Sequence, residues 1–390
     1  MDTDVEVGTG PGHVLNLIRT GRSRTRTDIQ KATGLSRVTV SQRVDALLRA
    51  GLIREGGRAD STGGRRPLQL EFDHGVGVVL GMALNTRHAT VGVLDLGANL
   101  LASEELPADV TRAPAETIDE LLDASLRLLT QVGVSVEDVV GVGVSVPGPV
   151  DPHTGRLNEP PIMVGWHDFD IAEQVRRRIP VPVTVENDAN AMAIGEVRAT
   201  GDPTTLVFLK VSTGIGAGIV LDGRIWAGND GGAGDIGHMR VGSGSDGRVC
   251  RCGSTGCLAA TASGGAIAAR LREMGHDDAR SARDVAELLR HGDPDATSLV
   301  VEAGNRIGEV MAAVVCVVNP QAVIVGGDLA SPTLLSAVVT SLVPRSMPRA
   351  TRNLIVRLSS AGEAAGLVGI ATLVLDDVYS MRRVNEICQG

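Results

Sequence analysis

The sequence predicts an α/β protein that begins with a winged helix-turn-helix and continues as a body of two similar lobes with a structural zinc segment. Three observations support this prediction. Helical segments joined by a glycine-containing turn precede a strand hairpin with a basic tip. In the body, strand hairpins followed by alternating helices and strands occur twice. One histidine and three cysteines cluster near residue 250 with the spacing of metal ligands.

Charge is divided unevenly along the chain. Residues 1–70 contain 12 Lys and Arg against 7 Asp and Glu, a net charge of +5. Because the whole chain has a net charge of −9, residues 71–390 carry −14. This asymmetry indicates that only the N-terminal part meets a polyanion. Basic residues are almost all arginine, because Lys31 and Lys210 are the only lysines.

Composition and the N-terminus predict a cytoplasmic protein. Hydrophobic residues make up 43% of the chain and charged residues 21%, which is typical of soluble globular proteins. No apolar run approaches the length of a membrane span, so no membrane partner is expected. Residues 1–10, predicted to be a disordered tail, are acidic and lack the apolar region of a secretory signal. Cysteines clustered at metal spacing favour a reducing compartment.

Residues 11–72, called the head below, predict a winged helix-turn-helix. Apolar residues at helical spacing and good N-cap residues predict three helices, and two apolar runs around a glycine-rich segment predict a hairpin. The expected helices are Pro11–Thr20, Asp28–Thr33 with Thr27 as N-cap, and Arg37–Ala50 with Ser36 as N-cap. The expected strands are Leu52–Glu55 and Leu68–Phe72, with Gly56–Pro67 as the tip.

The third helix of the head begins with polar and basic residues, as a helix that enters a DNA major groove does. We expect Arg37, Thr39 and Gln42 to read bases, with Ser41 and Arg43 beside them. Arg58, Arg65 and Arg66 lie on the tip, where they would reach phosphates or the minor groove. The alternative is a protein-binding or dimerisation module with a solvated arginine face.

The body, residues 73–390, predicts two similar α/β lobes. The first spans about 73–190 together with the C-terminal helix, and the second about 191–360. Glycine-rich turns follow strands at Gly141–Gly148, Thr213–Gly218 and Gly326-Gly327. Such turns let backbone amides approach a sugar or phosphate closely, so together they indicate a ligand cleft between the lobes.

His238, Cys250, Cys252 and Cys257 follow one another at intervals of twelve, two and five residues. Three thiolates and an imidazole form a tetrahedral set that suits structural Zn²⁺. The glycine- and serine-rich stretch after His238 can fold back and bring the imidazole to the cysteines. The alternative is a flexible loop with incidental cysteines.

An acidic group, Glu186-Asn187-Asp188-Ala189-Asn190, follows a buried strand and opens a helix. A carboxylate there could accept a proton from a ligand hydroxyl as a general base. It could equally cap the helix by accepting backbone amides. The residues alone leave both interpretations open.

Several of these segments resemble the ROK family of repressors and sugar kinases. They are Pro147-Gly148, Gly165-Trp166, Glu186–Ala191, Gly214–Gly218, Gly231–His238, Cys250–Leu258 and Asn319-Pro320 with Gly326-Gly327. The resemblance covers about residues 11–380, and the head with its Gly63–Pro67 wing resembles the repressor branch of the xylose and N-acetylglucosamine repressors. It implies a two-lobed actin-like ATPase fold, zinc on the four ligands named above and a sugar in the cleft. It also implies sugar contacts from Gly148, Asn187, Asp188, Asp235 and His238, with Asp188 in the position of the kinase base.

The departures from the family's kinases concern phosphate and sugar. Kinases carry an Asp-x-Gly turn where this chain has Ala83, Leu84 and Asn85, so Mg²⁺ and phosphate lose their ligands. Glu is usual at Asp235 and at Ala259, and Asn at Ile162. We therefore expect no ATP cofactor, kinase activity that is absent or vestigial, and no catalytic residue beyond Asp188 as a candidate for a vestigial base.

Together these features predict a repressor of carbohydrate-related genes that binds a double-stranded DNA operator as a homodimer or homotetramer. A sugar effector in the cleft would change the spacing of the two heads. The alternatives are a sugar kinase with an added DNA-binding head and an effector-independent DNA-binding protein.

Overall fold

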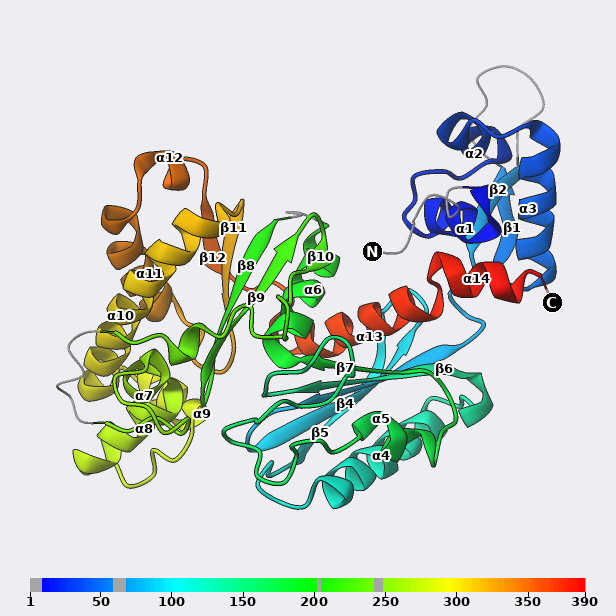
Figure 1. Ribbon diagram of the computed structural model, residues 1–390. Coiled ribbons are helices and arrows are strands. Elements are labelled where there is room, and N and C mark those ends of the chain that lie inside the picture. Colours follow the sequence, from blue (N-terminus) through cyan, green and yellow to red (C-terminus); the bar gives the residue numbers. More distant parts are fainter. Residues whose placement is uncertain (1–8, 59–67, 202–204, 242–247, 390) are drawn as a thin grey trace.

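The computed structural model describes residues 9–58, 68–201, 205–241 and 248–389. Its elements form a small head and two five-stranded sheets with helices between and around them (Figure 1). Most of the predicted tail and the wing residues Arg65 and Arg66 lie outside the described residues.

The head contains α1 (Pro11–Arg19), α2 (Arg26–Thr33), α3 (Arg37–Arg49) and the antiparallel pair β1 (Ile53–Arg58) and β2 (Leu68–Phe72). Ser36 caps α3 as expected, because its hydroxyl accepts the amide of Thr39. Gly34, with φ +70°, ends α2 in the left-handed conformation that glycine adopts without strain.

Two predictions for the head were wrong in detail. Helix α2 begins at Arg26 rather than Asp28, because the hydroxyl of Thr25, not of Thr27, accepts the amide of Asp28. Strand β1 continues to Arg58, which pairs with Leu68 after an irregularity in the register. The first strand therefore extends into the segment predicted as the tip.

The first lobe is built on the sheet β5-β4-β3-β6-β7. Strands β3 to β5 form antiparallel pairs, and β6 and β7 add in parallel to β3. Helices α4 and α5 cover one face and α13 the other (Figure 1). The bounds are β3 Val78–Leu84, β4 His88–Asp95, β5 Leu100–Pro107, α4 Pro114–Gln131, β6 Val139–Val146, α5 Ile171–Arg176, β7 Val183–Asn187 and α13 Ala365–Val378.

The second lobe repeats this pattern in the sheet β10-β9-β8-β11-β12. Strands β8 to β10 are antiparallel neighbours, and β11 and β12 add in parallel to β8. The bounds are β8 Leu206–Val211, β9 Ile215–Leu221, β10 Arg224–Ile225, β11 Ala322–Gly326 and β12 Ile355–Leu358. The helices of this lobe are α7 Leu258–Ala262, α8 Gly264–Glu273, α9 Ala282–Arg290, α10 Pro294–Val318, α11 Pro332–Arg345 and α12 Pro348–Thr351.

Helix α6 (Asp188–Thr200) and α13 pack tightly against each other between the two sheets (Figure 1). Glycines make this closeness possible. A Cβ at Gly369 would lie 1.7 Å from the carbonyl oxygen of Ala191, and one at Gly195 would lie 2.0 Å from that of Ala365. Helix α6 is thereby packed closely against α13, which leads to the C-terminal helix.

The C-terminal helix α14 (Met381–Ile387) was not predicted, and it packs against the head. The amide of Gly12 donates to Oδ1 of Asn385 at 2.8 Å. Buried side chains of α1 and β2 share one apolar cluster with Leu375, Tyr379 and Val384. The head and the end of the chain thus form a continuous core.

Within the described ranges, no single helix is long and apolar enough to cross a membrane. The pair Gly362–Val378 and Met381–Ile387 meets that test together by length and composition only, and it is bent by 52°.

Candidate functional site

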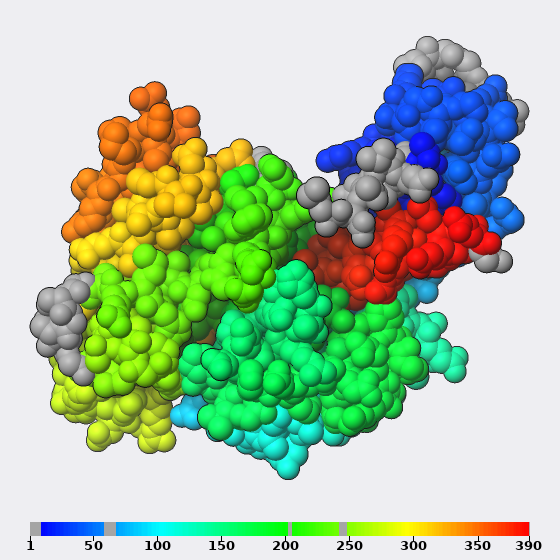
Figure 2. All heavy atoms as spheres, viewed as in Figure 1, coloured from blue at the N-terminus to red at the C-terminus, as the bar shows by residue number. Residues whose placement is uncertain are grey.

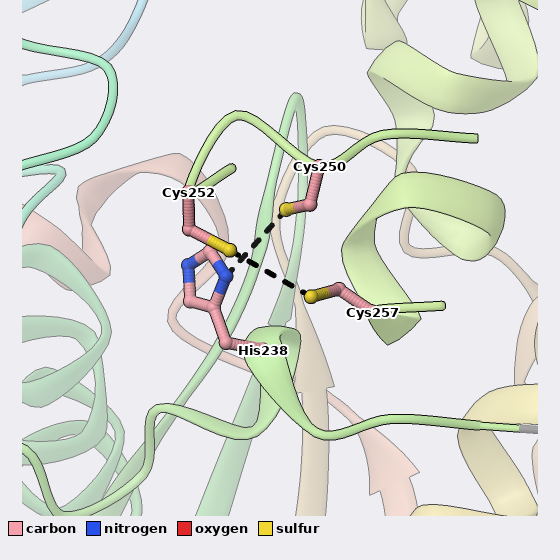
Figure 3. Close-up of side chains that lie close together, drawn as sticks. All are labelled: His238, Cys250, Cys252 and Cys257. Carbon is pink, nitrogen blue, oxygen red and sulfur yellow. Dashed lines mark hydrogen bonds between the residues drawn. The ribbon is translucent and has the colours of Figure 1, made fainter. Parts of the chain in front are cut away.

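The predicted metal ligands meet at the edge of the second lobe. His238 ends the 3₁₀ turn Ile236–His238, and the three cysteines surround a tight turn that leads into α7 (Figure 3). One ligand atom from each of the four residues lies within 4.8 Å of all the others. An isolated β-bridge between Arg240 and Cys257 joins the segment of His238 to that of the cysteines, and one between Val249 and Thr255 lies within the cysteine segment.

The spacing of these atoms fits tetrahedral zinc. Zn–S bonds of about 2.3 Å and a Zn–N bond of about 2.05 Å give tetrahedral edges of about 3.8 Å between sulfurs and about 3.6 Å between sulfur and nitrogen. The Sγ atoms of Cys252 and Cys257 are 3.7 Å apart, and Sγ of Cys250 is 3.6 Å from Nδ1 of His238. The residues present could therefore hold one metal ion of this size.

The thiols differ in acidity. A hydrogen bond from the backbone amide of Ser254 is the main cause that lowers the pKa of Cys252 to about 6. Burial raises the pKa of Cys257 to about 12, and the neighbouring cysteines add to this effect. A bound cation would reverse the second effect, because a coordinating thiol is deprotonated.

The two ring nitrogens of His238 face different partners. Nδ1 is directed at the thiols, whereas Nε2 lies 3.8 Å from Oδ1 of Asp235, whose side chain is 55% exposed. A metal on Nδ1 would leave Nε2 protonated, so that it could donate to Asp235 or to a ligand beside it.

The residues at the start of α6 have different hydrogen-bond partners. Asn187 is the N-cap, because its Oδ1 accepts the amides of Ala189 and Asn190 at 2.9 and 3.2 Å. Its Nδ2 donates to the carbonyl of Gly148 at 3.0 Å, which brings these two predicted sugar residues together. Glu186 accepts from Asn190 and the Asn187 amide, and burial raises the pKa of its carboxyl.

Asp188 does not cap the helix. Its carboxylate pairs with the ammonium of Lys210 on β8, and both side chains are buried. The same ammonium donates to Oδ1 of Asn85 at 3.0 Å. Lys210 was not predicted to belong to the site. It lies on a strand 22 positions after Asp188, and no local sequence pattern indicates that a strand residue will meet the start of that helix.

Strand β9 connects the two halves of the candidate sugar site. Gly218 lies against the backbone of Ala189, beside Asp188, since a Cβ there would be 2.4 Å from the Ala189 oxygen. On the same strand, the amide of Ala217 donates to the carbonyl of Gly234, the residue before Asp235. The backbone next to Asp188 and the backbone next to Asp235 therefore both pack on β9.

Three of the positions that depart from the kinase pattern, Ala83, Ile162 and Ala259, make apolar contacts in the structure. Ile162 packs against the core of the first lobe. Ala83 lies next to Gly366, since a Cβ added at Gly366 would be 3.4 Å from Cβ of Ala83. Ala259 lies on α7, 3.5 Å from the Cβ position of Gly237. These contacts offer no polar group to a sugar or a cation.

The first turns of α3 form the candidate nucleic-acid interface. Arg37 and Gln42 are exposed, and Thr39 and Ser41 are half-buried. Arg43 donates from Nε to the carbonyl of Thr9 at 3.2 Å. Val38, which was not predicted to be part of this interface, is 68% exposed between two predicted base readers. An exposed valine there could contact a thymine methyl group, and its place in the stretch Arg37-Val38-Thr39 was the available signal.

Comparison with known proteins matches the body to one family. A family model described as the ROK family matches residues 79–377. The chain belongs to the ROK family. The prediction of an α/β fold with the actin-like lobes of ROK proteins is thereby confirmed.

Individual ROK relatives include both repressors and kinases. The xylose repressor of Bacillus spizizenii (strain ATCC 23059 / NRRL B-14472 / W23) is 27% identical over 355 residues, which cover 90% of this chain and 91% of that protein. A glucokinase of Halalkalibacterium halodurans is 30% identical over 300 residues, which cover 72% of this chain and 90% of the enzyme. A crystal structure of a ROK family transcriptional regulator, a homologue of the E. coli MLC protein, shares the fold with a TM-score of 0.81 at 24% identity over 99% of this chain and 100% of that one.

Proposed function

We propose that this ROK protein is a transcriptional repressor of carbohydrate-related genes whose head, residues 11–72, binds a DNA operator. The observation that carries the proposal is the extent of the match to the xylose repressor. Residues 1–72 are about 18% of the chain, so a match covering 90% of it includes part of the head, whereas the glucokinase covers 72%. The exposed polar start of α3 supports the same assignment.

In this proposal α3 enters the major groove, with Arg37, Thr39 and Gln42 as base readers and Val38 as an apolar contact. Ser41 and Arg43 lie beside them, and Arg58, Arg65 and Arg66 of the wing contact phosphates or the minor groove. A homodimer or homotetramer would present paired heads to two half-sites. A cytoplasmic location follows from this function.

The body, residues 73–390, acts as the effector domain in this proposal. A sugar in the cleft would contact Asp188, Asp235 and His238, with Asn187 and Gly148 forming the wall beside them. Because Asn187 uses Oδ1 as a cap and Nδ2 on Gly148, its contribution to a sugar is limited to its second amide proton. Zn²⁺ on His238 and the three cysteines would fix the imidazole so that Nε2 faces the ligand.

DNA binding is tested by selecting sites from random duplexes with the full chain. We expect a two-fold symmetric consensus whose binding is released by a sugar. Enrichment of no sequence would contradict the proposal. A consensus that no sugar releases would support the effector-independent alternative.

The enzymatic alternative remains distinct, because Asp188 occupies the place of the kinase base. A coupled assay of ADP release with hexoses and N-acetylhexosamines separates the two functions. We expect no turnover, since Ala83 and Asn85 replace the phosphate-handling turn. Turnover that disappears in Asp188→Asn would establish a sugar kinase with a DNA-binding head.

A further inference from the structure

Lys210 connects the two lobes, whose surfaces meet in the space-filling view (Figure 2). It is one of two lysines in the chain, it is 8% exposed, and it lies on β8 of the second lobe. Its ammonium contacts the carboxylate of Asp188 at the start of α6 and Oδ1 of Asn85, which follows β3 of the first lobe. One side chain therefore connects elements that belong to both sheets.

A second connection lies beside the first. Arg283 on α9 of the second lobe donates to both carboxylate oxygens of Glu105 on β5, at 2.6 and 2.7 Å. It also donates to Nε2 of His88 on β4 at 3.0 Å, and Asp328 of its own lobe anchors it at 3.4 Å. Burial, with a further effect of Arg283, lowers the pKa of His88, which keeps the ring neutral and able to accept.

Both connections reach the turn between β3 and β4. Asn85 begins this turn, and its amide donates to the carbonyl of His88. The same turn occupies the position of the phosphate-handling Asp-x-Gly segment in kinases of the family. Here cations of the protein itself contact the turn from the opposite lobe, where a kinase would need a metal and a phosphate.

We propose that Lys210 is a positioning residue that ties the two lobes through Asp188 and Asn85 and so sets the interlobe angle without a nucleotide. Arg283 and Glu105 form the outer part of the same tie. Parting the lobes at this point would remove the hydrogen bond from the buried ammonium of Lys210 to Oδ1 of Asn85, so the lobes resist parting here. A ligand hydroxyl that reaches Asp188 must share the carboxylate with Lys210, and it would thereby change the strength of the tie.

The test is hydrogen exchange of the full-length protein without DNA or sugar, so its outcome is independent of the proposed function. In Asn85→Ala the Lys210–Asp188 pair and the fold are kept while the contact to the first lobe is lost. We expect amides of the β3–β4 turn and of β8 to exchange faster by about tenfold, the factor expected for losing one hydrogen bond to a charged group. Lys31→Met in the head is the matched control and leaves both segments unchanged.

Further variants distinguish a contact of Lys210 between the lobes from a stabilising role within the second lobe alone. Lys210→Met should accelerate exchange in both lobes, and Lys210→Arg should restore part of the protection. The double variant Asp188→Asn, Lys210→Met should be more thermally stable than Lys210→Met alone, because it leaves no unpaired buried charge. It should not regain the protection of the β3–β4 turn from exchange. If Asn85→Ala and Lys210→Met leave exchange of that turn unaltered, or affect only β8 and α6, Lys210 does not tie the lobes.

Discussion

Single side chains decide whether the second lobe can hold a metal ion. His238 precedes the first of the three cysteines by twelve residues, yet one donor atom from each of the four residues lies within 4.8 Å of all the others. The spacing in the sequence was enough to predict this grouping, because few ligand sets other than zinc sites combine such intervals. It could not predict which imidazole nitrogen faces the thiols, since that depends on the 3₁₀ turn that carries His238.

Replacing Cys252 by serine should abolish metal binding, because an uncharged hydroxyl is a far poorer ligand than a thiolate. Elemental analysis of the purified protein should fall from about one Zn²⁺ per chain to nearly none. Cys316→Ser changes an exposed cysteine outside the cluster and is the matched control. A wild-type protein that is stable and responsive without metal would contradict the assignment.

His276 should make stability depend on pH. A hydrogen bond to Asp295, with Asp293 nearby, raises the pKa of His276 above its ordinary value of 6.5. The protonated ring therefore stabilises the folded state fully below about pH 6.5, and this contribution is lost as the pH rises through the raised folded pKa. The deficit in Tm of His276→Gln should be larger at about pH 5.5 than at about pH 8.5.

Calorimetry of wild type and variant at both pH values measures this difference. His153→Gln, at an exposed histidine of the first lobe, serves as control. A deficit that is equal at both pH values would show that the ring acts by packing alone.

At the scale of elements, capping and periodicity predicted most of the secondary structure. Ser36 and the apolar positions of α3 located that helix within one residue. Helix α14 escaped prediction because Val384 is its only buried side chain, which leaves no periodic signal. This helix packs on the head, which lies more than 350 residues earlier in the sequence.

Helix α3 should carry base recognition. Arg37→Ala or Gln42→Ala should weaken binding to the selected operator by about 1–3 kcal/mol and relax the preference at one base position. Val38→Ala should cost less and affect a thymine position. Mobility-shift titration against operator and scrambled DNA measures both effects, and Arg352→Ala on the exposed surface of the second lobe is the control. Equal losses on both DNAs would assign these side chains to phosphate contacts instead.

The contact between α6 and α13 should tolerate no added side-chain atom. Gly369→Ala places a methyl group 1.7 Å from a backbone oxygen, so one of the helices must shift, at a cost of about 3 kcal/mol. Denaturant unfolding measures the loss. Gly232→Ala, where an added Cβ meets no atom within 4 Å, should change the free energy of unfolding little. Equal effects of the two substitutions would mean that the contact is not close-packed in solution.

At the scale of the whole molecule, the repeat of strand hairpins followed by alternating helices and strands was visible in the sequence, and the side-chain contacts between the lobes were not. Lys210 meets Asn85 across 125 residues, and Arg283 meets Glu105 across 178. Neither pair has a local pattern, because each depends on how two finished sheets face each other. The departures at Ala83 and Asn85 did predict that the phosphate position is changed, but not which side chains contact it.

The shared core of the head and α14 has a consequence for synthesis. Chains emerge from the ribosome with the N-terminal end first, and domains usually fold in that order. Here Val14 and Leu15 are made before the two lobes, while Tyr379 and Val384, which belong to the same apolar cluster, are made after them. The head therefore completes its packing only after the two lobes have been translated, and a chain that stops before α14 lacks part of the core of the head.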